Sequence, residues 1–300
     1  MKELPIELKR MLDALGAKEN VPMAQYTSFK TGGSVRILAE PDTAEHTAEL
    51  MRLIEAAGVE HYVIGNGTNL LISDKGLDAI VVRIGEKMAN VERSGRTIIA
   101  GAGASYAAMA KQSVQWGLMG LEWAAGIPGT VGGAVAMNAG AYGGETADAL
   151  KTVIYAENGA IIKETVDKTA FGYRLSPYCA PERIVIEAEF ELNDDDGSAY
   201  EKMTDYNKRR REKQPINYPS AGSVFKRPEG HFAGALIEQA GLKGTRIGGA
   251  EVSTLHAGFI INVGGATSRN VYELIRLVQQ KVKEHSGVQL ETEVKLLGEF

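Results

Sequence analysis

The stretch 121–145 (LEWAAGIPGTVGGAVAMNAGAYGGE) constrains this chain more than any other. It contains seven glycines and, apart from Glu122 and Glu145, no charged residue. Glycine lacks a Cβ atom and permits positive φ, so such a run is typical of backbone that approaches something closely. Backbone N–H groups in such a segment can cradle a phosphate or a flat ring. The simpler alternative is a glycine-rich turn between two elements.

Two further glycine-rich clusters lie upstream, at 28–33 (SFKTGG) and 64–71 (IGNGTNLL). None of the three clusters has the spacing G-x-G-x-x-G, and none continues into G-K-S or G-K-T. The dinucleotide-binding fingerprint and the P-loop are therefore not supported. Three glycine-rich loops in the first half of the chain predict one long ligand that is held at several points.

Composition narrows the class of protein. The chain has 300 residues, a net charge of −5 and 44% hydrophobic residues, which predicts one or two ordinary globular domains. The negative charge disfavours non-specific nucleic-acid binding. We expect no membrane span and no signal peptide. Cys179 is the only cysteine. It cannot form an internal disulfide and is most simply a packed thiol, so a cytoplasmic location is expected.

Hydrophobic periodicity predicts a mixed order of helices and strands. Asp42 followed by Glu45 resembles a capping box for the helix expected at 43–57, and Asn158-Gly159 predicts a hairpin turn. The basic run 208–213 reads as a solvated helix end or as an attraction for an anionic substrate. The mixed order indicates an α+β fold. The expected helices are 3–15, 43–57, 105–116, 198–213, 232–240 and 268–286, and the expected strands are 35–39, 62–64, 80–84, 97–100, 152–157, 160–164, 183–192, 258–263 and 290–297.

Three residues outside the glycine-rich clusters are candidates for chemistry. Arg174 follows an aromatic residue, and its planar fork could pair with a carboxylate, although a surface ion pair is the simpler reading. Ser223 lies among small residues, outside any G-x-S-x-G elbow, and unaided it would be a turn hydroxyl. Glu293 shares one face of the expected strand with Glu291 and Lys295, and this face could simply be solvated. No histidine has a partner at metal-ligand spacing, so we predict no metal.

Taken together, these motifs resemble the UDP-N-acetylenolpyruvoylglucosamine reductase family over most of the chain, from about residue 20 onward. The resemblance rests on six segments that occur in order, and any one alone would be weak. They are 26–33 (YTSFKTGG), 65–69 (GNGTN), 121–145, 172–174 (GYR), 222–225 (GSVF) and 291–294 (ETEV).

The resemblance implies a two-lobed FAD-binding domain of the vanillyl-alcohol-oxidase type, with lobes at 1–84 and 85–197. An α+β substrate domain at 198–300 follows, and its last strand could pack back on the FAD domain. Ser34 stands where covalently flavinylated relatives have a histidine, so FAD should be non-covalent. The implied FAD-binding residues are Lys30, Thr31, Gly32, Gly33, Gly65, Asn66, Gly67, Thr68, Asn69, Leu70, Gly126, Ile127, Pro128, Gly129, Gly132, Gly133, Asn138, Ala139 and Gly140.

The activity that the resemblance implies is NADPH-dependent reduction of UDP-N-acetylglucosamine enolpyruvate to UDP-N-acetylmuramate, in peptidoglycan synthesis. Flavin N5 would deliver hydride to the methylene carbon, and Ser223 would protonate the neighbouring carbon. Arg174 and Glu293 would polarise the carboxylate, Glu293 only if it is protonated or shares a hydrogen bond. An FAD-dependent oxidase of the same fold and a silent nucleotide-binding module are the alternatives.

The chain resembles the shorter branch of the family, because 174–178 runs almost directly into the strand expected at 183–192. The longer branch has an inserted loop there, with a tyrosine that folds over the uridine. The sequence therefore does not identify the residues that cover the UDP group. Charge and position suggest four residues that bind the diphosphate, which are Lys226, Arg227, Lys243 and Arg246. Tyr173, in the 172–174 motif, is a further candidate for substrate binding.

Overall fold

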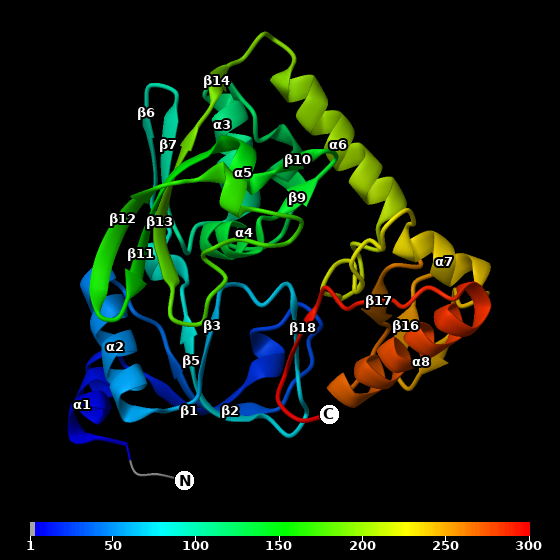
Figure 1. The fold of residues 1–300 in the computed structure, drawn as a ribbon, viewed down its shortest axis with the longest axis horizontal. Coiled ribbons are helices and arrows are strands. Elements are labelled where there is room, and N and C mark those ends of the chain that lie inside the picture. The colour runs from blue at the N-terminus through cyan, green and yellow to red at the C-terminus, as the bar shows by residue number, and fades with distance from the viewer. Residues whose placement is uncertain (1–3) are drawn as a thin grey trace. The chain divides into compact units, whose positions relative to one another are not determined.

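The computed structural model describes residues 4–300, which form two compact units (Figure 1). Both units are assembled from separate parts of the chain. The first holds the described residues up to Glu19, Ile37–Asn66 and Ala79–Arg209. The second holds Asn20–Arg36, Gly67–Asp78 and Arg210–Phe300. The helices are α1 (Ile6–Ala14), α2 (Ala44–Ala57), α3 (Tyr106–Gln115), α4 (Val131–Met137), α5 (Thr146–Ala149), α6 (Ala199–Lys213), α7 (Ala233–Gln239) and α8 (Ser268–Ser286).

The strands of residues 4–300 alternate irregularly with these helices, which confirms the α+β class. They are β1 (Lys18–Pro22), β2 (Ser34–Ala39), β3 (His61–Ile64), β4 (Leu70–Ile72), β5 (Leu77–Arg83), β6 (Val91–Ser94), β7 (Thr97–Gly101), β8 (Leu118–Met119), β9 (Gly140–Ala141), β10 (Gly144–Glu145), β11 (Leu150–Glu157), β12 (Ala160–Thr165), β13 (Ile184–Glu191), β14 (Asn193–Asp194), β15 (Arg246–Ile247), β16 (Ala250–Val252), β17 (Ile260–Asn262) and β18 (Lys295–Leu297).

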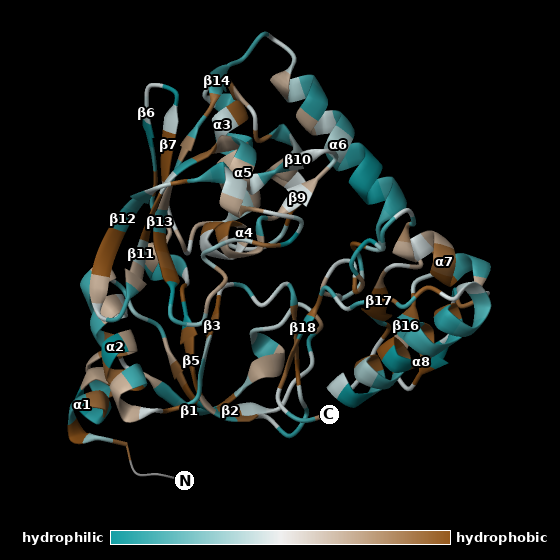
Figure 2. Ribbon diagram, viewed as in Figure 1, coloured by the Kyte–Doolittle hydropathy of each residue, from teal (hydrophilic) through white to brown (hydrophobic). Residues whose placement is uncertain are grey.

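The first unit is built around an antiparallel sheet of order β12-β11-β13-β7-β6. The hairpin between β11 and β12 turns at Asn158 and Gly159, which have φ of 52° and 77°, as the Asn-Gly signal predicts. Helix α2 packs against β11 and β13, and helix α4 packs against β13 and β7. A large cluster of buried hydrophobic residues joins these elements. Figure 2 shows the hydrophobic residues on β5 and β13, whereas α6 is polar along most of its length.

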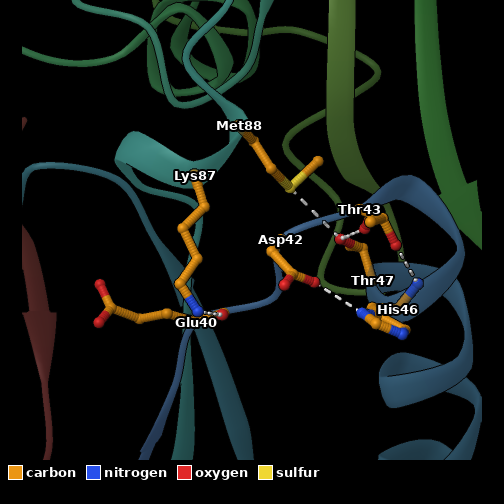
Figure 3. Close-up of polar contacts among 7 residues, drawn as sticks. All are labelled: Glu40, Asp42, Thr43, His46, Thr47, Lys87 and Met88. Carbon is orange, nitrogen blue, oxygen red and sulfur yellow. Dashed lines mark hydrogen bonds and ion pairs between the residues drawn. The ribbon is translucent and has the colours of Figure 1, made fainter. Parts of the chain in front are cut away.

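Helix α2 begins one residue later than the sequence suggested. Its N-cap is Thr43, not Asp42, and the Thr43 hydroxyl accepts the N–H of His46 at 3.0 Å (Figure 3). Asp42 instead contacts Nδ1 of His46 at 2.6 Å, and this hydrogen bond lowers the pKa of the Asp42 carboxyl. Thr43 satisfies one of the free N–H groups of the first turn, which is the usual work of an N-cap hydroxyl.

The second unit combines a three-stranded sheet, β15-β16-β17, with helices α7 and α8. Helix α8 begins at a capping box formed by Thr267 and Asn270 and ends at Gly287 in a left-handed conformation. Its buried face packs against β15 and β16. Strand β18 pairs in parallel with β4, which is also in this unit. Phe29 and Leu71, from the two early glycine-rich clusters, belong to the core of this unit.

The architecture departs from the sequence prediction in the third glycine-rich cluster and in the last strand. The stretch 121–145 is not a continuous loop, because it holds the short 3-10 helix Glu122–Gly126, helix α4 and the hairpin of β9 and β10. The final strand, expected at 290–297, is limited to 295–297, and Leu296 is 36% exposed. The three-way division at 84/85 and 197/198 stays a prediction; the compact units are two and are not contiguous in sequence.

Candidate functional site: the glycine-rich clusters and three reactive side chains

The second glycine-rich cluster contacts each of the other two. A Cβ atom on Gly65 would lie 2.2 Å from Oγ1 of Thr130, in the third cluster. A Cβ atom on Gly67, whose φ is 60°, would lie 2.0 Å from the carbonyl oxygen of Tyr26, at the edge of the first. The N–H of Ser28 also donates to Gly67 O at 3.1 Å. Glycine is required at 65 and 67 because these loops pack directly on one another.

Helix α4 lies inside the third cluster and is fixed at its start. Thr130 is its N-cap, and the Thr130 hydroxyl accepts the N–H of Gly133 at 3.2 Å. The N–H of Gly132 donates to Ala102 O at 2.9 Å, and a Cβ atom on Gly132 would lie 2.9 Å from that of Ala102. These amides are hydrogen-bonded within the protein. A flavin contact by Gly132 or Gly133, which stays a prediction, would therefore use other atoms.

The first cluster is attached to the start of α8. The buried hydroxyl of Ser268 donates to Oγ1 of Thr31 at 2.9 Å. The Asp74 carboxylate accepts the N–H groups of Ser268 and Arg269, each at 2.8 Å. A Cβ atom on Gly33 would lie 2.3 Å from the Asp74 carbonyl oxygen. Sequence reasoning missed Asp74 and Ser268; the Thr267–Asn270 capping box was the available signal for the start of α8, and Asp74 carried none.

The backbone of the three glycine-rich clusters has one property that suits binding of the FAD diphosphate. The clusters are held together by contacts that a Cβ atom would destroy, and their backbone turns left-handed at Lys30, Gly32, Gly67 and Gly129. Successive amides in such turns form concave sites for anions such as a diphosphate. The side chain of Asn69 is used inside the protein, because its Nδ2 donates to Glu293 O at 3.3 Å. The individual flavin contacts of all three clusters stay predictions.

Arg174 lies in a tight turn of the first unit. Gly172 and Leu175 exchange two backbone hydrogen bonds, each 3.0 Å long, and Arg174 has a φ of 56°. One guanidinium nitrogen of Arg174 donates to Gly140 O at 3.0 Å. The guanidinium carbon also lies 5.0 Å from the centre of the Tyr173 ring. Tyr173 is 53% exposed, so this turn presents an aromatic face and a cation together.

Ser223 lies in the second unit, after a glycine that makes the turn. Gly222 has a φ of 77°, and a Cβ atom at this position would meet no other atom within 4 Å. Ser223 forms an isolated antiparallel bridge with Phe259, and its hydroxyl donates to Phe225 O at 3.2 Å. The next residue, Val224, donates its N–H to Gly258 O at 2.9 Å. Ser223 is half-buried, with its backbone held on both sides.

Glu293 is brought to the same place as Ser223. Its N–H donates to Val224 O at 2.7 Å, and Phe225 forms a bridge with Thr292. The structure therefore places Ser223 and Glu293 on neighbouring backbone segments of the second unit, whereas Arg174 belongs to the first unit.

The four cations expected at the substrate all lie in the second unit. Lys226 pairs with Glu291 at 3.2 Å and Lys243 with Glu238 at 2.6 Å, through exposed carboxylates. Such exposed pairs are weak and a stronger anion can displace them. Arg246 instead pairs with the buried carboxylate of Glu251, and this ion pair stabilises the fold. Arg227 stacks on Phe232, with 4.1 Å between its guanidinium carbon and the ring centre.

Sequence reasoning also missed His256, which supports the Ser223 segment. Its Nδ1 accepts the N–H of Gly258 at 3.1 Å, and its ring packs edge-on against Phe259. Burial is the main cause that lowers the pKa of His256 below its ordinary value. Histidine spacing alone gave no signal for this role, since the partners are a backbone amide and an aromatic ring.

Residues 4–300 offer neither a metal cluster nor a membrane span. No group of three or more His, Cys, Asp or Glu side chains in this range is placed to hold a metal ion. No helix there has both the length and the apolar character needed to cross a membrane.

Comparison with known proteins assigns both parts of the chain. Residues 35–163 match the family model described as FAD binding domain, and residues 214–297 match that of the UDP-N-acetylenolpyruvoylglucosamine reductase C-terminal domain. A UDP-N-acetylenolpyruvoylglucosamine reductase of Alkaliphilus oremlandii is 45% identical over 280 residues, covering 93% of this chain and 92% of the relative. That of Caldanaerobacter subterraneus is 45% identical over 305 residues and covers all of both chains.

A solved structure gives the same result for the fold. The crystal structure of the UDP-N-acetylenolpyruvylglucosamine reductase from Thermus caldophilus superposes with a TM-score of 0.81 at 34% identity. It covers 93% of this chain and 98% of that one. The flavin-domain architecture expected from the sequence is thereby confirmed.

Proposed function

The chain belongs to the UDP-N-acetylenolpyruvoylglucosamine reductase family, and on that premise we propose that it reduces UDP-N-acetylglucosamine enolpyruvate to UDP-N-acetylmuramate. FAD is the bound cofactor and NADPH the reductant. The product is a peptidoglycan precursor, so the enzyme serves cell-wall synthesis and, through it, cell shape and division. The observation that carries the proposal is the adjacency of the Ser223 and Glu293 segments within the part matched by the reductase-specific model.

The reaction adds a hydride and a proton across the enolpyruvyl double bond. Charge builds on the substrate carboxylate after hydride addition, and donors placed in advance at such a charge lower the barrier. Arg174 offers a fork that matches a carboxylate. Ser223 supplies the proton to the carbon next to the carboxylate. Glu293 assists as a protonated acid or through a shared hydrogen bond, because an ionised carboxylate would repel the developing charge.

FAD, when bound, supplies the hydride-transfer chemistry between NADPH and the enolpyruvyl group. The residues that would hold it are those of the three glycine-rich clusters, through groups other than the amides of Gly132 and Gly133, which are hydrogen-bonded within the protein. Hydrogen bonds from N–H groups to charged oxygens contribute roughly 1.5–3 kcal/mol each.

The UDP group is assigned to the cations of the second unit. Lys226 and Lys243 are the better candidates, because they pair with exposed carboxylates, and Arg227 is a further candidate. Arg246 is the weaker candidate, since releasing it would leave the buried Glu251 carboxylate unpaired. We also propose a cytoplasmic location, where NADPH and UDP-sugars are available, with no nucleic-acid or membrane partner.

The test is a colour experiment in the absence of oxygen. NADPH should bleach the yellow protein, and UDP-N-acetylglucosamine enolpyruvate should restore its colour. UDP-N-acetylglucosamine, which lacks the enol ether, is the matched control and should leave the protein bleached. A yellow protein that NADPH fails to bleach would favour an FAD-dependent oxidase, which uses oxygen instead of NADPH. A protein purified without flavin absorbance, and unable to take up added FAD, would favour a silent nucleotide-binding module.

The flavin should be dissociable, because Ser34 offers no imidazole for a covalent bond. Acid precipitation should leave the yellow colour in the supernatant. Colour that stays with the precipitated protein would contradict this prediction.

A further inference from the structure

Asn138 is the C-cap of helix α4, and its side chain forms hydrogen bonds to two other segments of the chain. Its backbone is left-handed, with φ of 42° and ψ of 56°, and its N–H still bonds back into the helix. The side chain is completely buried. Oδ1 accepts the N–H of Ala147 at 3.0 Å, and Nδ2 donates to Gly172 O at 3.0 Å. Both ends of the amide are therefore committed to backbone groups of the protein.

The second of these bonds reaches the turn that carries Arg174. Gly172 O accepts Nδ2 of Asn138 and the N–H of Leu175, so both of its lone pairs are used. Arg174 occupies the third position of this turn with a φ of 56°. Positive φ at that position is normally left to Gly or Asn. A strained residue of this kind persists only where its surroundings over-determine its conformation.

The same short segment also holds the other end of Arg174. Gly140, two residues after Asn138, accepts a guanidinium N–H of Arg174 at 3.0 Å. Gly140 is in turn paired with Glu145 across the hairpin of β9 and β10. Residues 138–140 thus fix the backbone of the Arg174 turn through Asn138 and its guanidinium through Gly140.

We propose that Asn138 is a positioning residue for Arg174, which aims the guanidinium at the carboxylate of the substrate. This inference rests on the proposed function and deepens it. It gives Asn138 a role different from the flavin contact that the family resemblance implied, because its side-chain amide is fully buried and engaged at both ends.

The decisive variant is Asn138→Asp. Aspartate has nearly the same shape, tolerates a left-handed backbone and keeps the acceptor for Ala147, but it cannot donate to Gly172 O. We expect the return of colour with UDP-N-acetylglucosamine enolpyruvate to slow by roughly 10–100-fold, the scale of a misplaced catalytic group. Bleaching by NADPH and FAD affinity should stay within about twofold of wild type. Asn158→Asp is the matched control, since Asn158 is also left-handed but lies exposed in the β11–β12 turn, and it should change neither step.

Two further measurements separate positioning from a merely structural role. In a protein that already carries Arg174→Lys, adding Asn138→Asp should slow the return of colour by less than about twofold. Substitutions of residues that act as a unit do not have additive effects. The affinity of the oxidised protein for the product, UDP-N-acetylmuramate, should fall in Asn138→Asp, since the product carries the same carboxylate. Asn138→Gly, which keeps the backbone but lacks the amide, serves if Asn138→Asp does not fold.

Four results would count against the positioning role or the function on which it rests. Equal slowing of both steps, or a full additive loss in the Arg174→Lys background, would show that Asn138 serves the flavin or the fold. Wild-type rates in Asn138→Asp and Asn138→Gly would show that the turn needs no side-chain bond. If wild-type protein itself fails to recover its colour with the enolpyruvyl substrate, the proposed function has failed, which is a different result.

Discussion

The turn around Arg174 and the loop around Ser223 present their functional side chains in opposite ways. Arg174 itself has the positive φ. Its guanidinium donates to Gly140 O, and Gly172 O, in the same turn, accepts from Asn138 Nδ2 and from the N–H of Leu175. At Ser223 the positive φ lies on the preceding residue, Gly222, where it costs little. Ser223 continues in a bridge with Phe259 and needs no unusual backbone.

This difference decides where each region stores its strain. The Arg174 turn keeps a strained residue in place at a cost on the order of 1–3 kcal/mol, which the neighbouring bonds must offset. The Ser223 loop avoids that cost through a glycine. The first arrangement fixes a large cation with a defined direction, and the second leaves a small hydroxyl on relaxed backbone. Substitutions in the two regions should therefore separate activity from stability in different ways.

The largest effect on turnover is expected at Ser223. Ser223→Ala removes the proton donor and should slow the return of colour with the enolpyruvyl substrate by roughly 10²–10⁴, the usual contribution of a positioned acid. NADPH bleaching and stability should be preserved, because the hydrogen bond that this hydroxyl donates, to Phe225 O, joins groups only two residues apart. Ser223→Cys should recover part of the rate, since a thiol also donates a proton. Single-turnover measurement on pre-reduced protein tests this, and a wild-type rate in Ser223→Ala would assign the proton to water or another residue.

The strained site should lose activity without losing stability. Arg174→Lys keeps the charge but not the fork, and the same step should slow by roughly 10²–10³, the scale of one lost charge-stabilising donor. Arg174→Gly should be at least as inactive, yet its free energy of unfolding should not fall, because glycine accepts the positive φ. Thermal unfolding beside single-turnover kinetics tests both. A marked destabilisation of Arg174→Gly would mean that the guanidinium contacts, not the backbone, govern this turn.

Local and distant contacts also explain which features of the fold and the site could be predicted from the sequence. Helix α8 was predicted at 268–286, as observed, because its hydrophobic periodicity and the glycine at 287 are local signals. The Gly222-Ser223 pair was also visible as small residues before a strand. Helix α4 was missed, since it begins through bonds to residues 102–104 that no local pattern reveals. The roles of Asn138 and Asp74 were hidden for the same reason: their partners are backbone groups far away in sequence.

A moderate effect is expected from moving strain onto the Ser223 loop. Gly222→Ala places a Cβ atom on a residue with a φ of 77°, which should destabilise the protein by about 1–2 kcal/mol. It should also lower turnover, because the loop can relieve the strain by moving Ser223. Gly197→Ala is the matched control, since Gly197 also has positive φ and open space around it. Chemical denaturation and kinetics should show similar destabilisation in both but slower turnover only in Gly222→Ala. Equal turnover in the two variants would show that Ser223 does not depend on this turn.

The smallest effect concerns pH and again distinguishes the two regions. Burial lowers the pKa of His256 below its ordinary value of 6.5, so the folded protein binds this proton more weakly than the unfolded chain. Stability is then complete above about pH 6.5 and is lost as the pH falls from there through the lower pKa of the folded state. Protonation of Nδ1 would also break its bond to the Gly258 N–H, beside Ser223. His256→Gln should therefore show a flatter fall in unfolding midpoint than wild type as the pH falls through this range, whereas His285→Gln, at an exposed position, should follow wild type. Identical pH profiles for wild type and His256→Gln would remove His256 from the support of the Ser223 loop and leave that loop to its backbone bonds alone.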